Sequence, residues 1–269
     1  MRNTYRILLT VMLVMVAIAV KAAGAASGES HSCQAEDKPL EIKQNPQIMK
    51  IGIIVAMVKE RELLLPLMEN VRQEGNIVYG NIGNHHIALM QSGIGKVNSA
   101  LATKELIDVF HPDLVINTGV AGGAGSGIPV GTVVVGDSVA YHDVDCGPET
   151  ELGKADGCPM YFVGAEMVTS LPCLKDECHG LICSGDQFVA DRPTIDRIVG
   201  QYPDVRAVDM ESASIAHTCH RYGVPFCSLR VVSDTPGEVE NNTNQYLDFW
   251  TEAPKSTFRC LQAILTALQ

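Results

Sequence analysis

The chain has 269 residues, of which 46% are apolar, 19% charged and 5% aromatic. This composition excludes intrinsic disorder and supplies enough apolar material for one large core. Twenty Lys and Arg residues against 31 Asp and Glu residues give a net charge of −11, which argues against nucleic acid or an anionic membrane surface as a partner. The nine cysteines show no CxxC spacing, so neither a zinc site nor a thioredoxin-like centre is predicted.

Residues 1–25 have the layout of a secretory signal peptide. Arg2 and Arg6 precede an apolar run, Ile7–Val20, and small residues with an A-x-A exit follow at Ala23–Ala25. The run is too short for a membrane-spanning helix, which needs roughly 20 residues. We therefore predict an exported protein, periplasmic or secreted, with no stable membrane anchor. An uncleaved anchor is the alternative.

Residues 26–48 are polar and lack an apolar period, which is typical of a linker. Residues 49–269 show no internal repeat and no change of composition, and we predict a single domain there. Because export leads to an oxidising compartment, disulfides between some cysteines are compatible with this chain. Five cysteines lie between Cys146 and Cys183, but neither their spacing nor the odd total of nine assigns any pair.

From residue 49 onward, strand-like apolar runs alternate with helical spacing. Met49–Ala56 predicts a strand, and Val58–Asn70 predicts the helix that follows it. Further strands are expected at Ile77–Ile82, Ile87–Gln91, Leu114–Thr118, Thr132–Val139, Gly180–Ser184, Ala207–Met210 and Pro225–Val232, and further helices at Lys96–Phe110, Thr194–Tyr202, Ser212–Arg221 and over most of Tyr246–Leu268. Strands that are apolar on both faces indicate a sheet covered on both sides, and a hairpin-like pair around Gly80–His86 makes that sheet mixed.

Carboxylates stand at the ends of three predicted strands, where ligands of layered α/β domains bind. They are Glu60, Glu211 and Asp234, and a small-residue turn, Ser184–Asp186, leads to the aromatic Phe188. Each acid alone fits a solvated charge or a helix-terminal residue. Three together favour acid–base chemistry, because burial can raise the pKa of one carboxyl while another stays ionised.

Two further motifs resemble sites for phosphate or a metal ion but lack residues that such sites require. Gly119–Gly123 resembles a phosphate-binding nest, but it lacks the G-x-G-x-x-G spacing and the lysine of nucleotide-binding loops. His142–Asp145 offers one histidine and two acids without a second histidine at helical spacing, so no metal site is predicted.

Seven motifs, taken in order, carry a family resemblance: IGIIVAMVKE, SGIGKVNSA, INTGVAGG, YHDVD, SGDQFV, VDMESASIAH and LRVVSD. On these, the chain from about Met49 to its end resembles the 5′-methylthioadenosine/S-adenosylhomocysteine nucleosidases of the purine nucleoside phosphorylase superfamily. The resemblance implies an α/β fold, a three-layer αβα sandwich with a central mixed β-sheet. It also implies a homodimer that hydrolyses the N-glycosidic bond of these nucleosides and releases adenine without a metal or organic cofactor.

The resemblance also implies roles for individual residues. Glu60 resembles the base that activates water, Asp234 the acid that protonates adenine, and Glu211 the acceptor for the ribose hydroxyls. The implied substrate-binding set comprises Phe188 stacked on adenine, the Val189 backbone at the base edge, Met57, Ile94 and Met210 as apolar walls, Ala121 and Gly122 beneath the purine, Arg230 near the water, and Ser233. In this family a loop of the neighbouring subunit closes the pocket, and here it corresponds to the segment around Tyr141–Phe162.

The chemistry of the bond agrees with these roles. The adenine anion is a poor leaving group, so the purine needs a proton as it departs. Negative charge near the ribose stabilises the developing cation, and the carboxylates of Glu60 and Glu211 supply it. A carboxylate beside the attacking water would repel a phosphate ion, which favours hydrolysis over phosphorolysis.

Two departures from the family pattern bear on the site. Many relatives carry serine where this chain has Val120, which removes a hydroxyl, and many carry glutamate where it has Asp209, whose shorter side chain argues against a ribose contact. Two alternatives remain open. One is a nucleosidase for another adenine nucleoside, such as 5′-deoxyadenosine or aminodeoxyfutalosine. The other is a non-catalytic exported binding protein that kept the fold.

Overall fold

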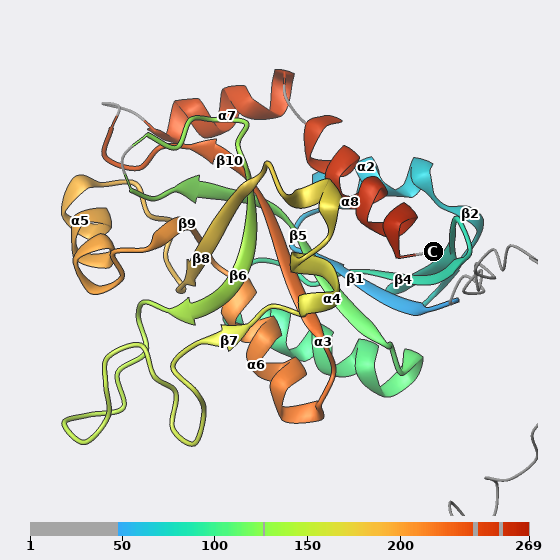
Figure 1. Ribbon diagram of the computed structural model, residues 1–269, viewed down its shortest axis with the longest axis horizontal. Helices are drawn as coiled ribbons and strands as arrows, with labels where there is room; N and C mark the ends of the chain where they lie inside the picture. Colours follow the sequence, from blue (N-terminus) through green and yellow to red (C-terminus); the bar gives the residue numbers. More distant parts are fainter. Residues whose placement is uncertain (1–47, 126, 239–241, 253–254, 269) are drawn as a thin grey trace, which may run out of the picture. The chain divides into compact units, whose positions relative to one another are not determined.

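The computed structural model describes residues 48–125, 127–238, 242–252 and 255–268 (Figure 1). The predicted leader, residues 1–25, and all of the predicted linker except Ile48 lie outside the described residues. Within the described ranges, no helix is both long enough and apolar enough to cross a membrane.

The first segment of the domain forms an open sheet with one helix. Strand β1 (Lys50–Val55) leads into α2 (Val58–Leu64), and a 3₁₀ turn, η1 (Leu65–Leu67), follows at once. The prediction of a helix as far as Asn70 is wrong, because Pro66 has no N–H to continue the helical ladder. The chain instead forms β2 (Glu69–Glu74), a strand exposed at every position and therefore without the apolar alternation that predicts one.

The remaining predicted elements follow in the expected order, most strands being longer than predicted. The elements after β2 are β3 (Ile77–Ile82), β4 (His85–Gln91), α3 (Lys96–Phe110), β5 (Leu114–Gly123), β6 (Val133–Tyr141), β7 (Phe162–Val163), α4 (Glu166–Thr169), η2 (Pro172–Leu174), β8 (Cys178–Ser184), α5 (Arg192–Gln201), β9 (Val205–Asp209), α6 (Ser212–Tyr222), β10 (Phe226–Asp234), α7 (Asn242–Glu252) and α8 (Lys255–Ala267). Of these, β7, α4 and η2 form in a stretch where no element was predicted. The glycine-rich turn predicted at 119–123 is the second half of β5. These glycine-rich residues continue the strand because β10 pairs with them as far as Gly122.

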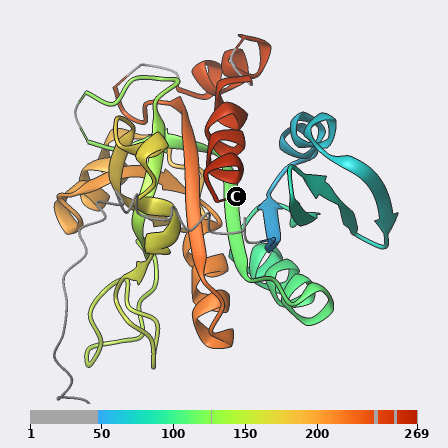
Figure 2. The ribbon, with the colours of Figure 1, turned by 45° about the vertical axis from the view of Figure 1, so that its right-hand side comes forward.

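The strands form one mixed sheet that also closes on itself. From β5 outward, the neighbouring strands are β1, β4, β3 and β2 in that order. Strand β5 also pairs with β10 and with β9. Because β10, β6, β8 and β9 are paired in that order, these four strands and β5 form a closed ring. The β1 pairs with β4 and β5 are parallel, whereas β10–β6 and β5–β9 are antiparallel, which confirms the predicted mixed sheet. Figure 2 shows β2 and β3 on one side of the molecule and α5 on the other.

Helices cover both faces of the sheet, as the αβα prediction requires. Ile51 and Ile53 of β1 pack with Leu64 of α2 and Leu261 of α8, whereas Ile54 packs on the other face with residues of α3 and α6. This alternation has period two, and both faces are buried, so β1 reads as a continuous apolar run. Helix α5 packs separately against β8 and β9.

Candidate active site

The candidate site occupies an interruption in strand pairing along β5. Strand β1 pairs with β5 only as far as Asn117, and β9 pairs with β5 at Gly122 and Gly123. Between them, the Val120 N–H donates to the carboxylate of Glu60 instead of to a strand, at 3.2 Å. A pocket opens there.

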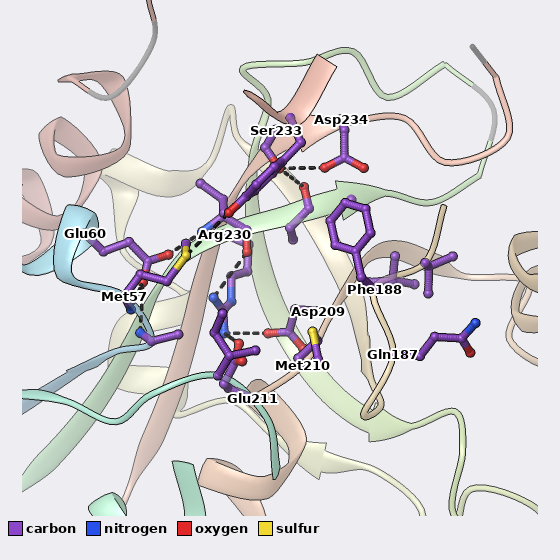
Figure 3. A pocket seen from close by; sticks show the side chains of 18 residues that line it. Met57, Glu60, Gln187, Phe188, Asp209, Met210, Glu211, Arg230, Ser233 and Asp234 are labelled. Atoms are coloured by element: carbon purple, nitrogen blue, oxygen red, sulfur yellow. Dashed lines mark hydrogen bonds and ion pairs between the residues drawn. The ribbon is translucent and has the colours of Figure 1, made fainter. Parts of the chain in front are cut away.

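The pocket collects side chains from the ends of β1, β5, β8, β9 and β10 and from α7 (Figure 3). Every residue that the sequence places in the site lines it: Met57, Glu60, Ile94, Ala121, Gly122, Phe188, Val189, Met210, Glu211, Arg230, Ser233 and Asp234. The structure therefore brings these residues together, while the role of each stays a prediction. Val120, Asp209, Gln187 and Tyr246 also line the pocket.

Glu60 is buried in the first turn of α2 and is fixed by backbone amides. Its Oε2 accepts N–H groups from Ala56 at 2.8 Å and Met57 at 2.9 Å, and its Oε1 accepts the Val120 N–H. The carboxylate thus reaches back to cap its own helix. Burial raises the pKa of Glu60, while Arg230 and these amides act in the opposite direction. A fixed carboxylate with a raised pKa is suited to take a proton from water.

Arg230 is fully buried on β10 and is held by partners on several strands. Its Nη2 lies 2.5 Å from Asp209 Oδ2 and 3.4 Å from Glu211 Oε2, and donates to Asn117 Oδ1 at 2.7 Å. Its Nη1 donates to the Val120 carbonyl at 3.3 Å. A buried cation requires such partners, because its desolvation is costly. These partners leave the guanidinium neutralised rather than available to an incoming anion.

Asp209 anchors this arrangement from the end of β9. Its carboxylate accepts hydrogen bonds from the hydroxyls of Ser184 and Ser212 and from the Ser212 N–H at 3.1 Å. Asp209 therefore contacts Arg230 rather than standing apart from the site, and its shorter side chain suits this pairing.

Gly119 is required where Glu60 and Arg230 approach β5. A Cβ at position 119 would overlap Glu60 Oε1 and would lie 2.6 Å from Arg230 Nη1. No side chain fits at that distance, which explains the glycine of the INTGVAGG motif by close approach rather than by phosphate binding.

Glu211 stands at the N-terminus of α6, and its Oε1 accepts the Gly95 N–H at 2.9 Å. Burial raises the pKa of Glu211 to about 7, and the negative charges of Asp209 and Glu60 act in the same direction against Arg230. Like charges that share a low-dielectric site cannot all ionise at equal cost, so Glu211 retains a proton over an unusually wide pH range.

Asp234 ends β10 and is held by two side chains. The Ser233 hydroxyl donates to Oδ1 at 2.7 Å, and Asn242 Nδ2 donates to Oδ2 at 2.9 Å. Asn242 also donates to the Val189 carbonyl at 3.3 Å, which links Asp234 to the segment after β8. Burial raises the pKa of Asp234 in spite of these donors. A raised pKa suits a carboxyl that must deliver a proton.

Aromatic and apolar side chains close the remaining sides. Phe188 is 44% exposed and meets Tyr246 edge to face, with ring centroids 5.5 Å apart. The Tyr246 hydroxyl donates to Met57 Sδ at 3.4 Å. In Figure 3, Phe188 and Glu60 lie on different sides of Arg230. A flat ring can therefore stack on Phe188 while the other end of the ligand meets Glu60.

The lining holds four carboxylates and, among the described residues, one arginine or lysine, Arg230. Chemically, this arrangement can deliver a proton to a leaving group, stabilise a developing cation and activate water. Within the described ranges, no group of three or more His, Cys, Asp or Glu side chains is placed to hold a metal ion.

Comparison with known proteins identifies the family. The sequence profile of the Phosphorylase superfamily matches residues 50–266. A 5′-methylthioadenosine/S-adenosylhomocysteine nucleosidase of Actinobacillus succinogenes is 41% identical over 214 residues, covering 74% of this chain and 92% of that protein. The chain belongs to this nucleosidase family within the phosphorylase superfamily.

Solved structures agree with the assignment to the nucleosidase family. The S-adenosylhomocysteine nucleosidase of Streptococcus pyogenes, in complex with 5-methylthiotubericidin, matches with a TM-score of 0.78 and 36% identity, over 82% of this chain and 98% of that one. The futalosine hydrolase of Helicobacter pylori matches with a TM-score of 0.74 and 28% identity, over 81% and 98%.

The residues of the site that the sequence did not predict include four polar ones with defined contacts: Asn117, Asp209, Asn242 and Tyr246. A polar residue inside the apolar run of β5 was the available signal for Asn117. Tyr246 and Asn242 lie on a helix that follows the last strand, and helical spacing does not reveal which residues point to a pocket formed elsewhere in the chain.

We expect the raised pKa of Glu211 to appear in the pH dependence of stability. Between pH 4.5, the ordinary pKa of glutamate, and about pH 7, the folded pKa of Glu211, the folded protein keeps the Glu211 proton. The unfolded chain has lost this proton in the same range. This contribution is complete below the ordinary pKa and is lost as pH rises through the folded pKa. Relative to Glu211→Gln, the wild type should lose about 3 kcal/mol of unfolding free energy across this window.

Urea denaturation of both proteins at about pH 4.5 and about pH 7.5 measures this difference. Glu69→Gln, a substitution of an exposed acid on β2, is the matched control and should show no comparable change. An equal gap between wild type and Glu211→Gln at both pH values would contradict the assignment.

Proposed function

We propose that the protein hydrolyses the N-glycosidic bond of 5′-methylthioadenosine and S-adenosylhomocysteine, releasing adenine and the corresponding thioribose product. One observation carries the proposal: a single pocket presents Asp234 and Glu60, each buried with a raised pKa but held by different partners, in a chain of the nucleosidase family. Asp234 is held by two side chains and Glu60 by three backbone amides.

Each acid then has a distinct task. Asp234 donates its proton to the purine as the bond to the ribose breaks, and Ser233 and Asn242 stabilise the carboxylate that remains. The negative charge of Glu60 stabilises the ribose cation, and Glu211 adds to it when ionised, above its folded pKa of about 7. Glu60 takes the proton of the attacking water, since it is the carboxylate fixed by three amides.

The purine is expected to lie against Phe188, with Ala121 and Gly122 beneath it. Stacking on an aromatic ring contributes roughly 1–3 kcal/mol per base. Met57, Ile94 and Met210 provide the apolar surface that a thioether substituent prefers.

Water is favoured over phosphate as the nucleophile. Arg230 is the one arginine or lysine in the described lining, and Asp209, Glu211 and Asn117 already engage it. A phosphate dianion would meet the carboxylates of Glu60 and Glu211 without a free cation to compensate.

The test is adenine release by the purified protein, followed with and without inorganic phosphate. We expect release from 5′-methylthioadenosine and S-adenosylhomocysteine at the same rate in both conditions. Asp234→Asn, a nearly isosteric change, should lower the rate at least about 100-fold while the circular dichroism spectrum is unchanged. Release that requires phosphate would overturn the hydrolase proposal.

The substrate panel should include 5′-deoxyadenosine and aminodeoxyfutalosine. A preference for aminodeoxyfutalosine would replace the proposed substrates by that nucleoside, in line with the similarity to a futalosine hydrolase. No release from any of the four would favour a non-catalytic binding protein.

We also propose a homodimer formed through α3. Its solvent-facing side carries Val97, Leu101 and Val109, which are 68%, 65% and 60% exposed, and Ile94 at the pocket mouth is 52% exposed. A second copy on this face would bury these side chains and cover the pocket mouth. The segment 142–161 extends away from the sheet in Figure 1, as the predicted intersubunit loop would.

Light scattering after size-exclusion chromatography tests the dimer. The wild type should have twice the mass of one chain, and Leu101→Glu should shift it toward the monomer by placing a charge in the interface. Val71→Glu, on the exposed strand β2, is the control and should remain dimeric. A monomeric wild type would refute the proposal.

Export is the remaining proposal, based on the N-terminal pattern of residues 1–25. The protein recovered from the periplasm or medium should begin at Ala26, as measured by mass spectrometry of its N-terminal peptide. Intact Met1 on a chain that fractionates with membranes would instead indicate an uncleaved anchor.

A further inference from the structure

Three cysteines line a groove that shares no residue with the active-site pocket. Cys173 belongs to η2, Cys178 begins β8, and Cys260 lies on α8, near the end of the chain. All three are free thiols in the structure. None of them belongs to a family motif described above, so the nucleosidase function does not account for them.

The groove brings together two segments that are distant in sequence. Residues of η2 and α8 approach within 8 Å, measured between Cα atoms, and Leu174 packs in the same apolar cluster as Cys260 and Leu261. Disulfide-bonded residues usually have Cα atoms about 4.4–6.8 Å apart, and the approach of η2 to α8 within 8 Å is close to this range.

The surroundings of each thiol distinguish the possible pairs. Burial raises the pKa of Cys260 to about 12, and the nearby charges of Glu177 and Cys173 act in the same direction. Burial raises the pKa of Cys178, and the charges that also act on it are those of Arg206, Asp137 and Glu177. Cys227, which lies near Cys260, is completely buried and inaccessible to an oxidant.

We infer that Cys173 and Cys260 form a site of reversible disulfide formation that joins η2 to α8. The exposed Cys173 thiolate attacks a disulfide oxidant such as oxidised glutathione, and one glutathione thiolate leaves. The Cys260 thiolate then attacks Cys173 Sγ and displaces the second glutathione. In total, two protein thiols are oxidised to one disulfide, and the oxidant is reduced to two thiols.

This bond would fix the C-terminal part of the domain. Helix α8 follows α7, which carries Asn242 and Tyr246 of the active site, and η2 lies in the segment between β6 and β8. A link across 87 positions of sequence restricts the unfolded chain strongly. Neither cysteine lines the active-site pocket, so we expect greater stability with unchanged turnover.

The purified protein should be equilibrated with oxidised glutathione, alkylated and digested. We expect a linked peptide that joins Cys173 to Cys260 and the loss of two alkylatable thiols. Reduction should lower the melting temperature of the oxidised protein by roughly 5–10 °C. The melting temperatures of Cys173→Ser and Cys260→Ser should not respond to the reductant.

Cys146→Ser is the matched control, because Cys146 is exposed but does not line the groove, and it should behave as the wild type. Full alkylation after oxidation, glutathione adducts alone, or a linked peptide with Cys178 or Cys227 in place of either partner would overturn the inference. Adenine release is measured in parallel, so an inactive protein that still forms the link would refute only the proposed function.

Discussion

The site depends on the buried charge of Arg230. A guanidinium without solvent needs anionic partners, and Asp209 and Glu211 provide them from the end of β9 and the start of α6. The same charge acts on Glu60, which approaches from α2. Elements from both halves of the domain thus converge on one cation. Burial, reinforced by the charges of Asp209 and Glu60, raises the pKa of Glu211 and keeps a proton available where the chemistry needs one.

The sheet provides the space for this cluster of charged side chains around Arg230. If β1 continued beside β5, the amide of Val120 would pair with another strand, and no pocket would form. Because β1 stops at Val55 and β9 pairs with β5 only at Gly122 and Gly123, the intervening backbone is free to bind Glu60. Gly119 allows Glu60 and Arg230 to approach that backbone closely. Because β1 and β9 both pair with β5, the two sides of the gap are held by one strand.

Two carboxyls with different surroundings divide the acid and base roles. Asp234 makes no hydrogen bond to Arg230 or its partners among the contacts described above. Its hydrogen-bond partners are the neutral side chains of Ser233 and Asn242. Glu60 is held by amides and lies within the field of Arg230. Such a separation of environments is the usual way in which one site supplies a proton and accepts another at the same pH.

The sequence by itself determined the alternation of strands and helices and the mixed sheet, because apolar periodicity is a local property. Strand-end positions indicated the three acids and Phe188, and the family resemblance of the motifs supplied the other pocket residues. Its errors were also local: Pro66 ended a predicted helix early, and β2 lacked any apolar signal. Only the tertiary structure decided that Asp209 pairs with Arg230, that Asn242 and Tyr246 reach the pocket, and that Cys173 lies beside α8. Those contacts join residues far apart in the chain, and their energies arise from burial and charge that exist only after the layers have packed.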